Sequence, residues 1–552
     1  MAGQTSGRME TDYVIVGGGS AGCVLANRLS EDPSCRVILV EAGGEADSFL
    51  VRTPAGMSRL IGNQRYDWQY SSELDPSISG RKFIWSGGKI LGGGSSINGQ
   101  VYIRGTRADF DYWAEQGCAD WGFDNCLPYF VRAEDFAGAP SAVHGQGGPL
   151  AVSYQRDPHP LSDAFLQACA ASGLPMLDEY CAGDQHGAFM SLTTQRNGQR
   201  CSTAHGYLAA ARGRSNLTVL TNSHAQRIVF AGKHATGVEV LRGGERLHLA
   251  ARAEVLVSAG TMGSPALLMR SGVGPAAHLQ QFGISVVADR QGVGRNLQEH
   301  VGVAINKFVN VPTYNSQMSP FQLAGHMANY LLRKRGPMVT PAVQAMACAR
   351  TRSELTEPDV QLHFLPLSYD ITHEVQCAAL AKMTRDPTAT IQVNVCHPYS
   401  RGSVHLQSGD ASDLPRVSHE LLGDTRDVRT LIGACKLVEG IFSAPPLQQF
   451  VHGDRTPSPR PLHDDDWEQF IRDHANVCYH PVGTCRMGSD DDAVLDPTLA
   501  VRGVTGLRVV DASIMPRLPS ANTNAAAIMI GERGSDFVRG KSLHVSTQVE
   551  FS

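Results

Sequence analysis

The fold of this chain is decided by residues 12–22, which read Asp12-Tyr13-Val14-Ile15-Val16-Gly17-Gly18-Gly19-Ser20-Ala21-Gly22. The apolar run predicts a buried parallel strand, and a G-x-G-x-x-G pattern follows it directly. Residues 23–29 have helical apolar spacing, and residues 36–40 predict a second buried strand that ends at Glu41. Strand, glycine turn, helix, strand and acid in this order predict a dinucleotide-binding unit.

Each part of this unit has a role in binding a dinucleotide. Gly17 permits the tight turn, Gly19 lets the backbone approach a pyrophosphate, and Gly22 lets the helix pack on the strand. The helix N-terminus presents N–H groups and a positive dipole end to phosphates, and Glu41 can accept hydrogen bonds from a ribose diol. The unit alone does not distinguish NAD from FAD. Its candidate binding residues are Gly17, Gly19, Ser20, Ala21, Gly22, Glu41 and Ala42.

Bulk properties indicate a globular protein of more than one domain. The 552 residues exceed the size at which a single core stops growing, and 42% of them are hydrophobic. The net charge of −5 gives no reason to expect nucleic acid or an anionic membrane as a partner.

Cysteine usage and the N-terminal residues bear on the compartment. The thirteen cysteines are scattered and form no C-x-x-C, which favours free thiols in a reducing compartment over disulfides or a zinc site. Residues 1–10 lack the apolar region of a secretory signal, and no stretch approaches the roughly 18 apolar residues of a transmembrane helix. We therefore expect a cytoplasmic protein, with peripheral attachment to a membrane left open.

Two later regions also have the character of a nucleotide domain. The first predicts a β-meander, then a buried strand over 255–260 and a helix over 264–269 with Pro265 in its first turn. The second predicts a strand over 506–512 that ends in an acid, followed by an alanine-rich helix over 524–537. The strands of the meander are expected at 217–220, 225–230, 237–241 and 246–250.

The sequence between these regions mixes other strands and helices. Strands are expected at 360–365, 390–395 and 402–406, and helices at 426–442 and 464–473. The simplest account is an α/β protein: a discontinuous Rossmann-like nucleotide domain into which an α+β substrate domain with an antiparallel sheet and helices is inserted. The nucleotide domain takes residues 11–155, 206–300 and 475–540, the substrate domain takes 156–205 and 301–474, and 1–10 and 541–552 are peripheral tails.

Three further motifs could carry chemistry. The glycine- and serine-rich loop from Lys89 to Gly105 can wrap closely around a flat or phosphorylated ligand; its apolar flanks disfavour the alternative of a flexible surface loop. His480 precedes a proline in a glycine-rich turn, and an imidazole titrates in the range that a general base needs, although a lone histidine is more often structural. Residues 519–524 either simply cap the last helix or place its N-terminus at a ligand atom that gains negative charge.

Taken together, these motifs resemble the glucose–methanol–choline (GMC) family of flavin oxidoreductases over nearly the whole chain. The resemblance rests on the opening G-x-G-x-x-G with Glu41, the loop from Gly87 to Gly105, and the later stretches Ser258–Pro275, Gly292–His300, His480–Thr484 and Asn522–Asn524.

The resemblance implies tightly held FAD and oxidation of an alcohol. His480 matches the general base that takes the hydroxyl proton while the carbon-bound hydride moves to flavin N5. Asn522 matches its partner, and we assign it hydrogen bonding to the substrate oxygen only, because an amide does not titrate. Thr523 and Asn524 match residues near the pyrimidine edge of the flavin, where the helix dipole stabilises negative charge. The other implied cofactor residues are Leu91, Gly93, Gly94, Ser96, Asn98, Gly99, Val101, Asp511 and Ala512.

The sequence departs from particular members at two positions. Members with covalent FAD carry a histidine where this chain has Ile97, so we expect non-covalent FAD. Choline-oxidising members carry a glutamate where this chain has Gly302, and residues 301–350 contain no Trp. Because a buried cation needs a carboxylate or an aromatic face, we expect an uncharged alcohol as the substrate. Similar bacterial members oxidise aliphatic, aromatic or polyether primary alcohols, so the resemblance implies a primary aliphatic or aromatic alcohol.

Four functions remain open at this point. The leading one is an FAD-dependent alcohol dehydrogenase that passes electrons to a quinone, a cytochrome or a dye-like acceptor. The others are an alcohol oxidase of the same family that uses O₂ and makes peroxide, a hydroxynitrile-type lyase that keeps FAD without using its redox chemistry, and a non-catalytic nucleotide-binding protein.

Overall fold

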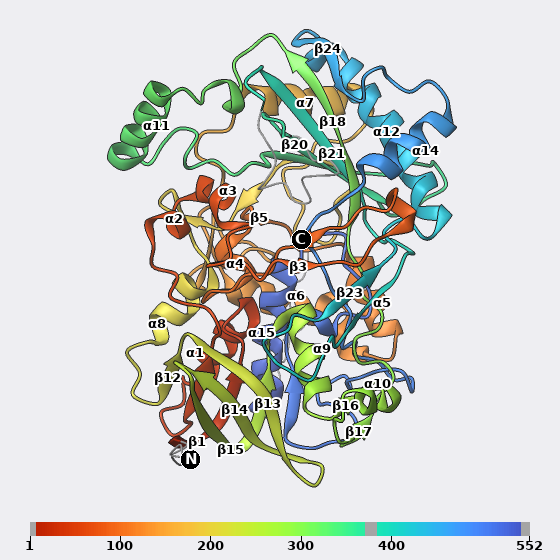
Figure 1. The fold of residues 1–552 in the computed structure, drawn as a ribbon. Coiled ribbons are helices and arrows are strands. Elements are labelled where there is room, and N and C mark those ends of the chain that lie inside the picture. The colour runs from red at the N-terminus through yellow and green to blue at the C-terminus, as the bar shows by residue number, and fades with distance from the viewer. Residues whose placement is uncertain (1–6, 370–383, 542–552) are drawn as a thin grey trace.

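The computed structural model describes residues 7–369 and 384–541. Figure 1 shows two packed parts, a lower one around the sheet that contains β1 and β15, and an upper one around the sheet that contains β18, β20 and β21. The tails predicted at 1–10 and 541–552 lie mostly outside the described residues.

The lower sheet has seven strands and joins three distant parts of the sequence. Its order is β12-β2-β1-β15-β14-β13, and β26 also pairs with β15. The pairs β12/β2, β2/β1, β1/β15 and β15/β26 are parallel, whereas β13/β14 and β14/β15 are antiparallel. The α/β fold class and the discontinuous nucleotide-binding sheet are therefore confirmed. The strands are β1 (Gly7–Val16), β2 (Val37–Val40), β12 (Leu217–Leu220), β13 (Ser223–Ala231), β14 (His234–Arg242), β15 (Glu245–Val257) and β26 (Leu507–Val509).

The first and last long helices of this part pack on each other. A side chain at Gly531 of α15 (Asn524–Val538) would lie 3.0 Å from the Cα atom of Ala21 in α1 (Ser20–Leu29), so the glycine permits the close approach. Arg28 of α1 also forms an ion pair of 2.8 Å with the buried Glu532 of α15. This packing fixes the C-terminal segment against the glycine turn.

The upper part contains a six-stranded antiparallel sheet with helices against it. Its order is β19-β20-β21-β18-β24, with β25 also paired to β18. The strands are β18 (Val301–Val309), β19 (Ala345–Ala349), β20 (Val360–Leu365), β21 (Thr388–Val395), β24 (Val451–Thr456) and β25 (Asn476–Val477), and the helices are α7 (Pro160–Ala171), α12 (Thr425–Ser443), α13 (Pro445–Gln448) and α14 (Asp464–His474). The predicted inserted domain with an antiparallel sheet and helices is confirmed in form.

Shorter elements connect and cover the two sheets. The helices are α2 (Phe49–Arg52), α3 (Met57–Leu60), α4 (Gly94–Ile97), α5 (Arg107–Glu115), α6 (Phe123–Ala133), α8 (Ala209–Ala211), α9 (Gly260–Arg270), α10 (Ala276–Gln281) and α11 (Pro320–Arg333). The strands are β3 (Tyr70–Ser71), β4 (Ile84–Trp85), β5 (Val101–Tyr102), β6 (Glu134–Phe136), β7 (Leu150–Val152), β8 (Gly187–Met190), β9 (Leu192–Thr193), β10 (Gln195–Arg196), β11 (Gln199–Arg200), β16 (Val273–Gly274), β17 (Ala288–Asp289), β22 (Gly402–His405) and β23 (Arg416–His419).

Several strands differ from the sequence prediction. β1 begins at Gly7, so residues 7–10 belong to the sheet and not to a tail; they pair with the long β15, and their polar side chains are largely exposed. Only β13, β14 and β15 form the predicted meander, because β12 instead pairs in parallel with β2. The strands expected at 246–250 and 255–260 are one strand, β15, whose polar residues near the middle hide its continuity.

The helix predicted from Ser264 starts four residues earlier. α9 begins at Gly260, so Pro265 lies inside the helix. Proline has no N–H and leaves the carbonyl of the residue four positions before it without its helical partner. That carbonyl belongs to Thr261, and it accepts a hydrogen bond of 2.6 Å from the hydroxyl of Thr484.

The packing crosses the predicted domain boundaries in places. Residues 70–85 were assigned to the nucleotide domain, yet Tyr70, Phe83 and Trp85 belong to the hydrophobic core of the upper part. Conversely, Phe189 and Leu192, assigned to the substrate domain, pack in the lower core, where β9 pairs with β5. The domain boundaries as drawn stay a prediction. No helix among the described residues is long and apolar enough to cross a membrane.

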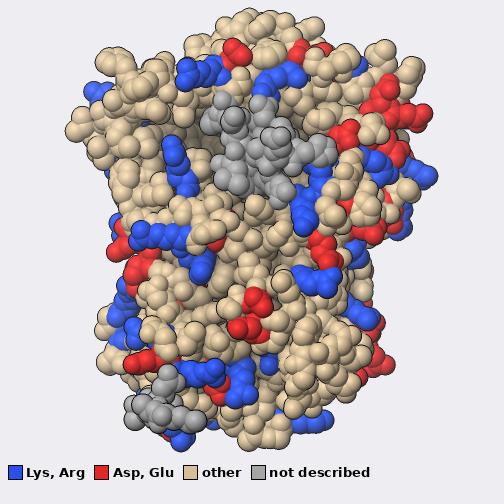
Figure 2. All heavy atoms as spheres, viewed as in Figure 1, with Lys and Arg blue, Asp and Glu red and all other residues tan. Residues whose placement is uncertain are grey.

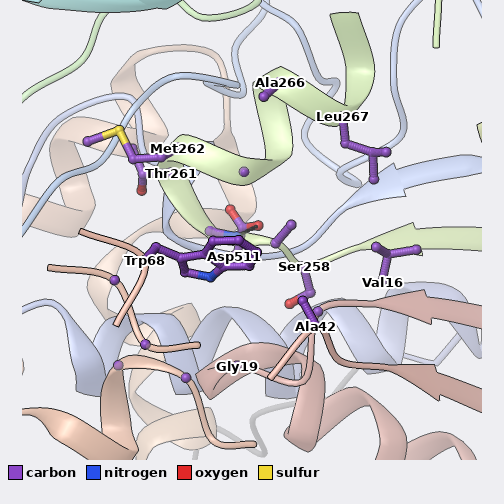
Figure 3. Close-up of a pocket in the computed structure, with 18 of the residues that line it drawn as sticks. Val16, Gly19, Ala42, Trp68, Ser258, Thr261, Met262, Ala266, Leu267 and Asp511 are labelled. Atoms are coloured by element: carbon purple, nitrogen blue, oxygen red, sulfur yellow. Dashed lines mark hydrogen bonds between the residues drawn. The ribbon is translucent and has the colours of Figure 1, made fainter. Parts of the chain in front are cut away.

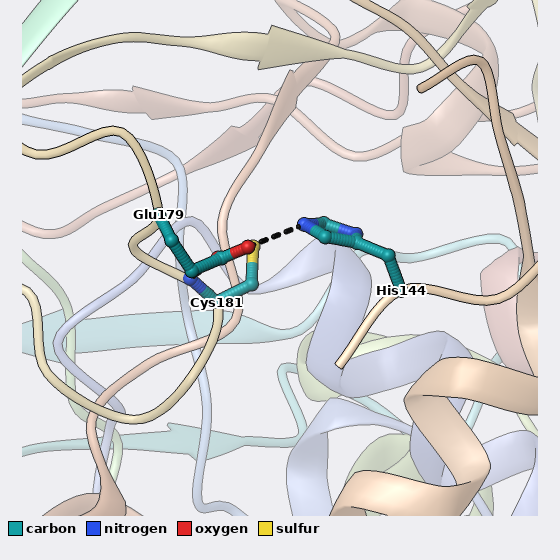
Figure 4. Close-up of side chains that lie close together, drawn as sticks. All are labelled: His144, Glu179 and Cys181. Atoms are coloured by element: carbon teal, nitrogen blue, oxygen red, sulfur yellow. Dashed lines mark hydrogen bonds and ion pairs between the residues drawn. The ribbon is translucent and has the colours of Figure 1, made fainter. Parts of the chain in front are cut away.

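A buried ionic cluster joins the loop before β7 to the loop before β8. The His144 ring lies between two carboxylates, with Nδ1 2.9 Å from Glu134 and Nε2 3.0 Å from Glu179. Figure 4 shows the contact with Glu179. Arg104 also pairs with Glu134 at 3.0 Å. Burial opposes the charged imidazole, but the hydrogen bonds that its ring donates to the two carboxylates outweigh this effect and raise the pKa of His144 to about 9.

Cys181 completes a group that could hold a metal ion by position. Both ring nitrogens of His144 lie within hydrogen-bond distance of carboxylates, and burial raises the pKa of the Cys181 thiol to about 12. In this structure the group is an ion-pair network that joins the two loops.

The first prediction concerns the pH dependence of stability. Since the folded state raises the pKa of His144 from 6.5 to about 9, its stabilisation is present in full below 6.5 and is lost as the pH rises through 9. We expect His144→Gln to lower the melting temperature more at pH 7 than at about pH 10. His234→Gln, at an exposed histidine, serves as the control. An equal loss at both pH values would contradict the account.

Candidate functional site

A cavity lies at the carboxyl ends of β1, β2 and β15, where parallel sheets of this kind bind ligands. Figure 3 shows it between the N-terminal segment (Val16, Gly19, Ala42), the start of α9 (Ser258, Thr261, Met262) and Asp511. Ten of the predicted residues line it: Gly17, Gly19, Ser20, Ala21, Glu41, Ala42, Gly93, Gly94, Asp511 and Ala512.

The glycines of the turn are required by backbone geometry. Gly17 has a φ of 102°, and a side chain there would lie 2.3 Å from the carbonyl oxygen of Ser258. A side chain at Gly22 would lie 1.9 Å from the carbonyl oxygen of Gly17. The N-terminus of α1 has no side-chain cap, so its N–H groups are available to a phosphate.

The second glycine loop packs directly on the first. The N–H of Gly92 donates to the carbonyl of Gly18 at 2.7 Å, and a side chain at Gly93 would lie 2.7 Å from the Cα atom of Gly19. A side chain at Gly94 would meet no atom within 4 Å, because this residue faces the cavity. The two loops thus form one glycine-lined wall.

Glu41 lies in the cavity wall with part of its bonding capacity used. Its carboxylate accepts from the N–H groups of Gly18 at 2.9 Å and Gly43 at 2.7 Å. Burial raises the pKa of Glu41 to about 7 against the effect of these bonds. A carboxylate has about four acceptor positions, so Glu41 can still accept from a ribose diol.

The C-terminal segment closes the other side of the cavity. Asp511 accepts from the Gly260 N–H at 2.9 Å and from the Ser264 hydroxyl at 2.5 Å, which joins it to α9. The Ser20 hydroxyl donates to the Asn524 side chain at 2.8 Å, so the glycine turn and the start of α15 meet. Thr523 precedes α15 without capping it.

Several predicted cofactor residues do not line this cavity. The Ser96 hydroxyl donates to the Leu91 carbonyl at 2.6 Å, and Asn98 accepts from the buried Arg200 at 2.8 Å. Val101 belongs to the β5–β9 pair. Ser96, Leu91 and Val101 are buried and pack inside the protein behind the cavity wall. Four more of the predicted residues do not line the cavity: Gly22, Gly99, Thr523 and Asn524. Their assignment to a cofactor stays a prediction.

Sequence reasoning missed other lining residues. Trp68 lies in the middle of the view in Figure 3. The Lys89 ammonium lies over its ring, 4.8 Å from the ring centre, in a cation–π contact. Arg270, at the end of α9, adds a cation to the wall. Residues 223–225 line the cavity from the start of β13. For residues 223–225, their position just after the strand predicted at 217–220 could have indicated a place in the cavity wall. For Trp68 and Arg270, the sequence contains no pattern that would predict one.

His480 is brought beside His300 by strand pairing. β25 pairs antiparallel with β18, Val301 opposite Val477, and beyond them Gln298 pairs with Val482. The register shifts between these points, where Tyr479 takes a φ of 63°. The two histidines therefore face each other, and their Nδ1 atoms are 2.9 Å apart.

The hydrogen bonds around this pair determine which nitrogens carry protons. The Cys396 carbonyl, 3.0 Å from Nε2 of His300, can only accept, so Nε2 is protonated. Neutral His300 then has its lone pair on Nδ1, and His480 must donate to it from its own Nδ1. The Nε2 atom of neutral His480 is left with a lone pair, 2.9 Å from the amide nitrogen of Asn522.

Burial keeps both rings neutral. It lowers the pKa of His300 to about 3 and, together with His300 and His363, lowers the pKa of His480 well below its usual value. The buried Glu299 accepts from the backbone N–H of His480 at 2.7 Å, but burial raises the pKa of Glu299 to about 8. At neutral pH, Nε2 of His480 therefore carries no proton, and its lone pair can accept one from a donor that displaces the Asn522 amide. The sequence prediction named His480 and Asn522 but gave His300 no role.

The chain belongs to the GMC oxidoreductase family. The N-terminal model of the family, described as GMC oxidoreductase, matches residues 11–302, and the C-terminal model matches residues 398–531. The resemblance expected from the motifs is thereby confirmed.

The similar proteins cover nearly the whole chain. An oxygen-dependent choline dehydrogenase from Brucella canis is 38% identical over 97% of this chain and 96% of its own length. One from Vibrio vulnificus is 36% identical over 96% of this chain and 94% of its own. Among solved structures, pyridoxine 4-oxidase from Mesorbium loti has a TM-score of 0.85 at 32% identity, covering 95% and 98% of the two chains, and a formate oxidase has a TM-score of 0.90 at 26% identity, covering 98% and 99%.

These matches support FAD as the cofactor, and the cavity fits it. An uncapped helix N-terminus suits a pyrophosphate, Arg270 adds a positive charge to the cavity wall, and Glu41 suits a ribose. The glycine wall leaves room for a flat ring system, since Gly94 faces open space. Ile97, at the position of the covalent histidine in other members, is buried at the end of α4 and has no nucleophilic atom.

The second prediction follows from Ile97. We expect acid precipitation of the holoenzyme to release the flavin into the supernatant, because no side chain at residue 97 can bond to it. A pellet that keeps its yellow colour after washing would show a covalent link elsewhere.

Proposed function

We propose that this protein oxidises an uncharged primary aliphatic or aromatic alcohol to the aldehyde, with FAD as the first electron acceptor and His480 as the base. The observation that carries the proposal is the hydrogen-bonded series Cys396–His300–His480–Asn522, which leaves a basic nitrogen beside the cofactor cavity. Tyr479 and Pro481, the chain neighbours of His480, line that cavity.

FAD, when bound, supplies a two-electron acceptor for the hydride of the alcohol carbon. The protein must hold the hydroxyl and take its proton. An alcohol hydroxyl next to His480 and Asn522 would take the place of the Asn522 N–H at Nε2: the hydroxyl gives its proton to that nitrogen, and its oxygen accepts from the displaced amide N–H. His300 holds the His480 ring in the tautomer that has this lone pair.

Two buried polar atoms support a substrate at this position. The Asn522 Oδ1 atom and the His363 Nε2 atom have no hydrogen-bond partner among the described residues. A buried polar atom without a partner costs about 1–3 kcal/mol. His363 lies close enough to His480 to lower its pKa, so a polar group of the substrate can satisfy both atoms.

The backbone supports an uncharged substrate. A side chain at Gly302 would lie 2.3 Å from the Val393 carbonyl oxygen, so a glutamate cannot replace this glycine without moving the strands. Glu299 points its oxygens at backbone N–H groups, and Asp109 is held by His397 at 2.6 Å and the Ser520 N–H at 2.8 Å. Neither carboxyl is free to bind a quaternary ammonium.

For the final acceptor we propose a quinone, a cytochrome or a dye-like molecule. The alternative is O₂, and it has specific support in the name of the bacterial relatives, oxygen-dependent choline dehydrogenase, and in the oxidases among the similar structures. A lyase of the hydroxynitrile type is a further alternative, because it would use the same base and leave the flavin oxidised.

The third prediction tests substrate and reaction together. Anaerobic addition of uncharged primary alcohols should bleach the flavin absorbance with saturation, whereas choline should not do so at sub-millimolar concentration. His480→Ala, with its FAD content checked, should be bleached at least about 100-fold more slowly, the low end of the contribution of a general base. Admission of air, with peroxide yield compared with dye reduction, then distinguishes oxidase from dehydrogenase.

Three results would overturn parts of the proposal. Saturable bleaching by low choline would contradict the uncharged substrate. A flavin that no alcohol bleaches would favour the lyase. A stoichiometric peroxide yield that outpaces dye reduction would establish the oxidase.

The fourth prediction concerns His300 as a positioning residue. We expect His300→Ala to slow flavin reduction by about 100-fold with little change in the KM of the alcohol, because His480 loses its preferred tautomer while the substrate contacts remain. His300→Asn should restore part of the rate, since its amide oxygen can accept from His480. FAD content and melting temperature serve as controls for folding. Equal rates in the Ala and Asn variants, or a wild-type rate in the Ala variant, would contradict this role.

A further inference from the structure

Helix α11 presents its apolar face to the solvent. It spans Pro320–Arg333 in the upper part and projects from the edge of the molecule in Figure 1. With 3.6 residues per turn, one face of this helix consists of Phe321, Ala324, Gly325, Ala328, Leu331 and Leu332. All six are exposed, including Phe321 at 90%, Leu332 at 84% and Leu331 at 54%.

The orientation of the helix is fixed from the opposite face. Tyr330 is fully buried, and its ring contacts that of Phe49 in α2 at 5.9 Å. The segment after the helix is tied to the rest of the protein by hydrogen bonds from the Ala55 N–H to Met338 at 3.2 Å and from Gln195 to Val339 at 3.0 Å. A surface helix normally turns its apolar stripe inward, and here anchoring of Tyr330 turns it outward.

Charge identifies the kind of surface that would cover this face. The helix and its C-terminal end, residues 320–335, contain no Asp or Glu and finish with three cations. Arg335 pairs with Asp157 at 2.9 Å, and the Lys334 ammonium lies 4.1 Å from the centre of the Tyr330 ring, whereas Arg333 is exposed. Arg333, Lys334 and Arg335 follow the apolar face directly at the C-terminal end of the helix. In the space-filling view, the protruding region at the upper left is mostly uncoloured and shows blue rather than red at its edges (Figure 2).

We propose that α11 docks this protein on an anionic lipid surface, with Phe321, Leu331 and Leu332 inserted and Arg333, at the basic C-terminal end of the helix, at the headgroups. An apolar helical face next to a basic cluster is the pattern of helices that lie in the membrane interface. A second copy of the chain, with its α11 antiparallel to this one, is the other occupant, and the experiment below distinguishes it from a lipid surface. Docking does not depend on the alcohol-oxidising activity.

Vesicle binding by the full-length holoenzyme tests the proposal. We expect binding to vesicles of phosphatidylcholine mixed with phosphatidylglycerol, and weaker binding to phosphatidylcholine alone. Phe321→Ser combined with Leu332→Ser should reduce the partition coefficient at least about tenfold. Leu462→Ser, at a residue that is 81% exposed elsewhere in the upper part, is the matched control and should bind as the wild type does.

A charge variant separates the two contributions. Arg333→Gln should weaken binding to the anionic vesicles by about fivefold and leave binding to neutral vesicles unchanged. FAD content and flavin reduction should stay at the wild-type level in all these variants, because none of these residues lies at the cofactor cavity or at His480.

Three outcomes would overturn the proposal. The first is a wild-type protein that does not bind the anionic vesicles. The second is equal binding by the Phe321/Leu332 and Leu462 variants. The third is a wild-type oligomer in sedimentation velocity that the Phe321/Leu332 variant dissociates, which would assign the face to contact between copies.

Discussion

The Cys396 carbonyl is the acceptor on which the proposed chemistry depends. It fixes the proton of His300 on Nε2, and this choice passes through the short Nδ1–Nδ1 contact to His480. Two buried imidazoles could share protons in several ways, but a carbonyl oxygen can only accept. The carbonyl of Cys396, the residue directly after β21, thus determines that the lone pair of His480 lies on Nε2, next to Asn522.

Both parts of the protein are needed to hold this arrangement. The upper sheet supplies the pairing of β18 with β25 that brings the histidines together. The lower part supplies α9, and its Pro265 frees the Thr261 carbonyl that accepts from Thr484, four residues after His480. Thr261 in turn donates to the Pro481 carbonyl at 2.7 Å. Two hydrogen bonds with Thr261, which lines the cavity, therefore hold the turn that carries His480, the proposed base, against the cavity wall.

Much of the lower part was predictable because its signals are local. The apolar run before Gly17 and the glycines themselves are dictated by close backbone approach, and the structure shows what a side chain at Gly17 or Gly22 would meet. The parallel pairing of β12 with β2 was not predictable, since a four-residue apolar strand carries no information about its neighbour. The interior position of Pro265 depended on Thr484, more than 200 residues away.

The site shows the same division. His480 and Asn522 stood out through their motifs, whereas the role of His300 depends on a register shift at Tyr479 and on a carbonyl from β21's C-terminal side. The sequence shows that Gly302 stands where choline-oxidising members have a glutamate. Only the structure shows that the Val393 carbonyl occupies the space that a side chain at Gly302 would need. Trp68 and Arg270 reach the cavity through tertiary packing alone.

The most direct test of this account is neutron diffraction from a deuterium-exchanged crystal of the holoenzyme at neutral pH. We predict deuterium on Nε2 of His300 and on Nδ1 of His480, and none on Nε2 of His480. Deuterium on Nε2 of His480, or on both nitrogens of its ring, would contradict the central claim that the Cys396 carbonyl and His300 keep this atom ready to accept a proton.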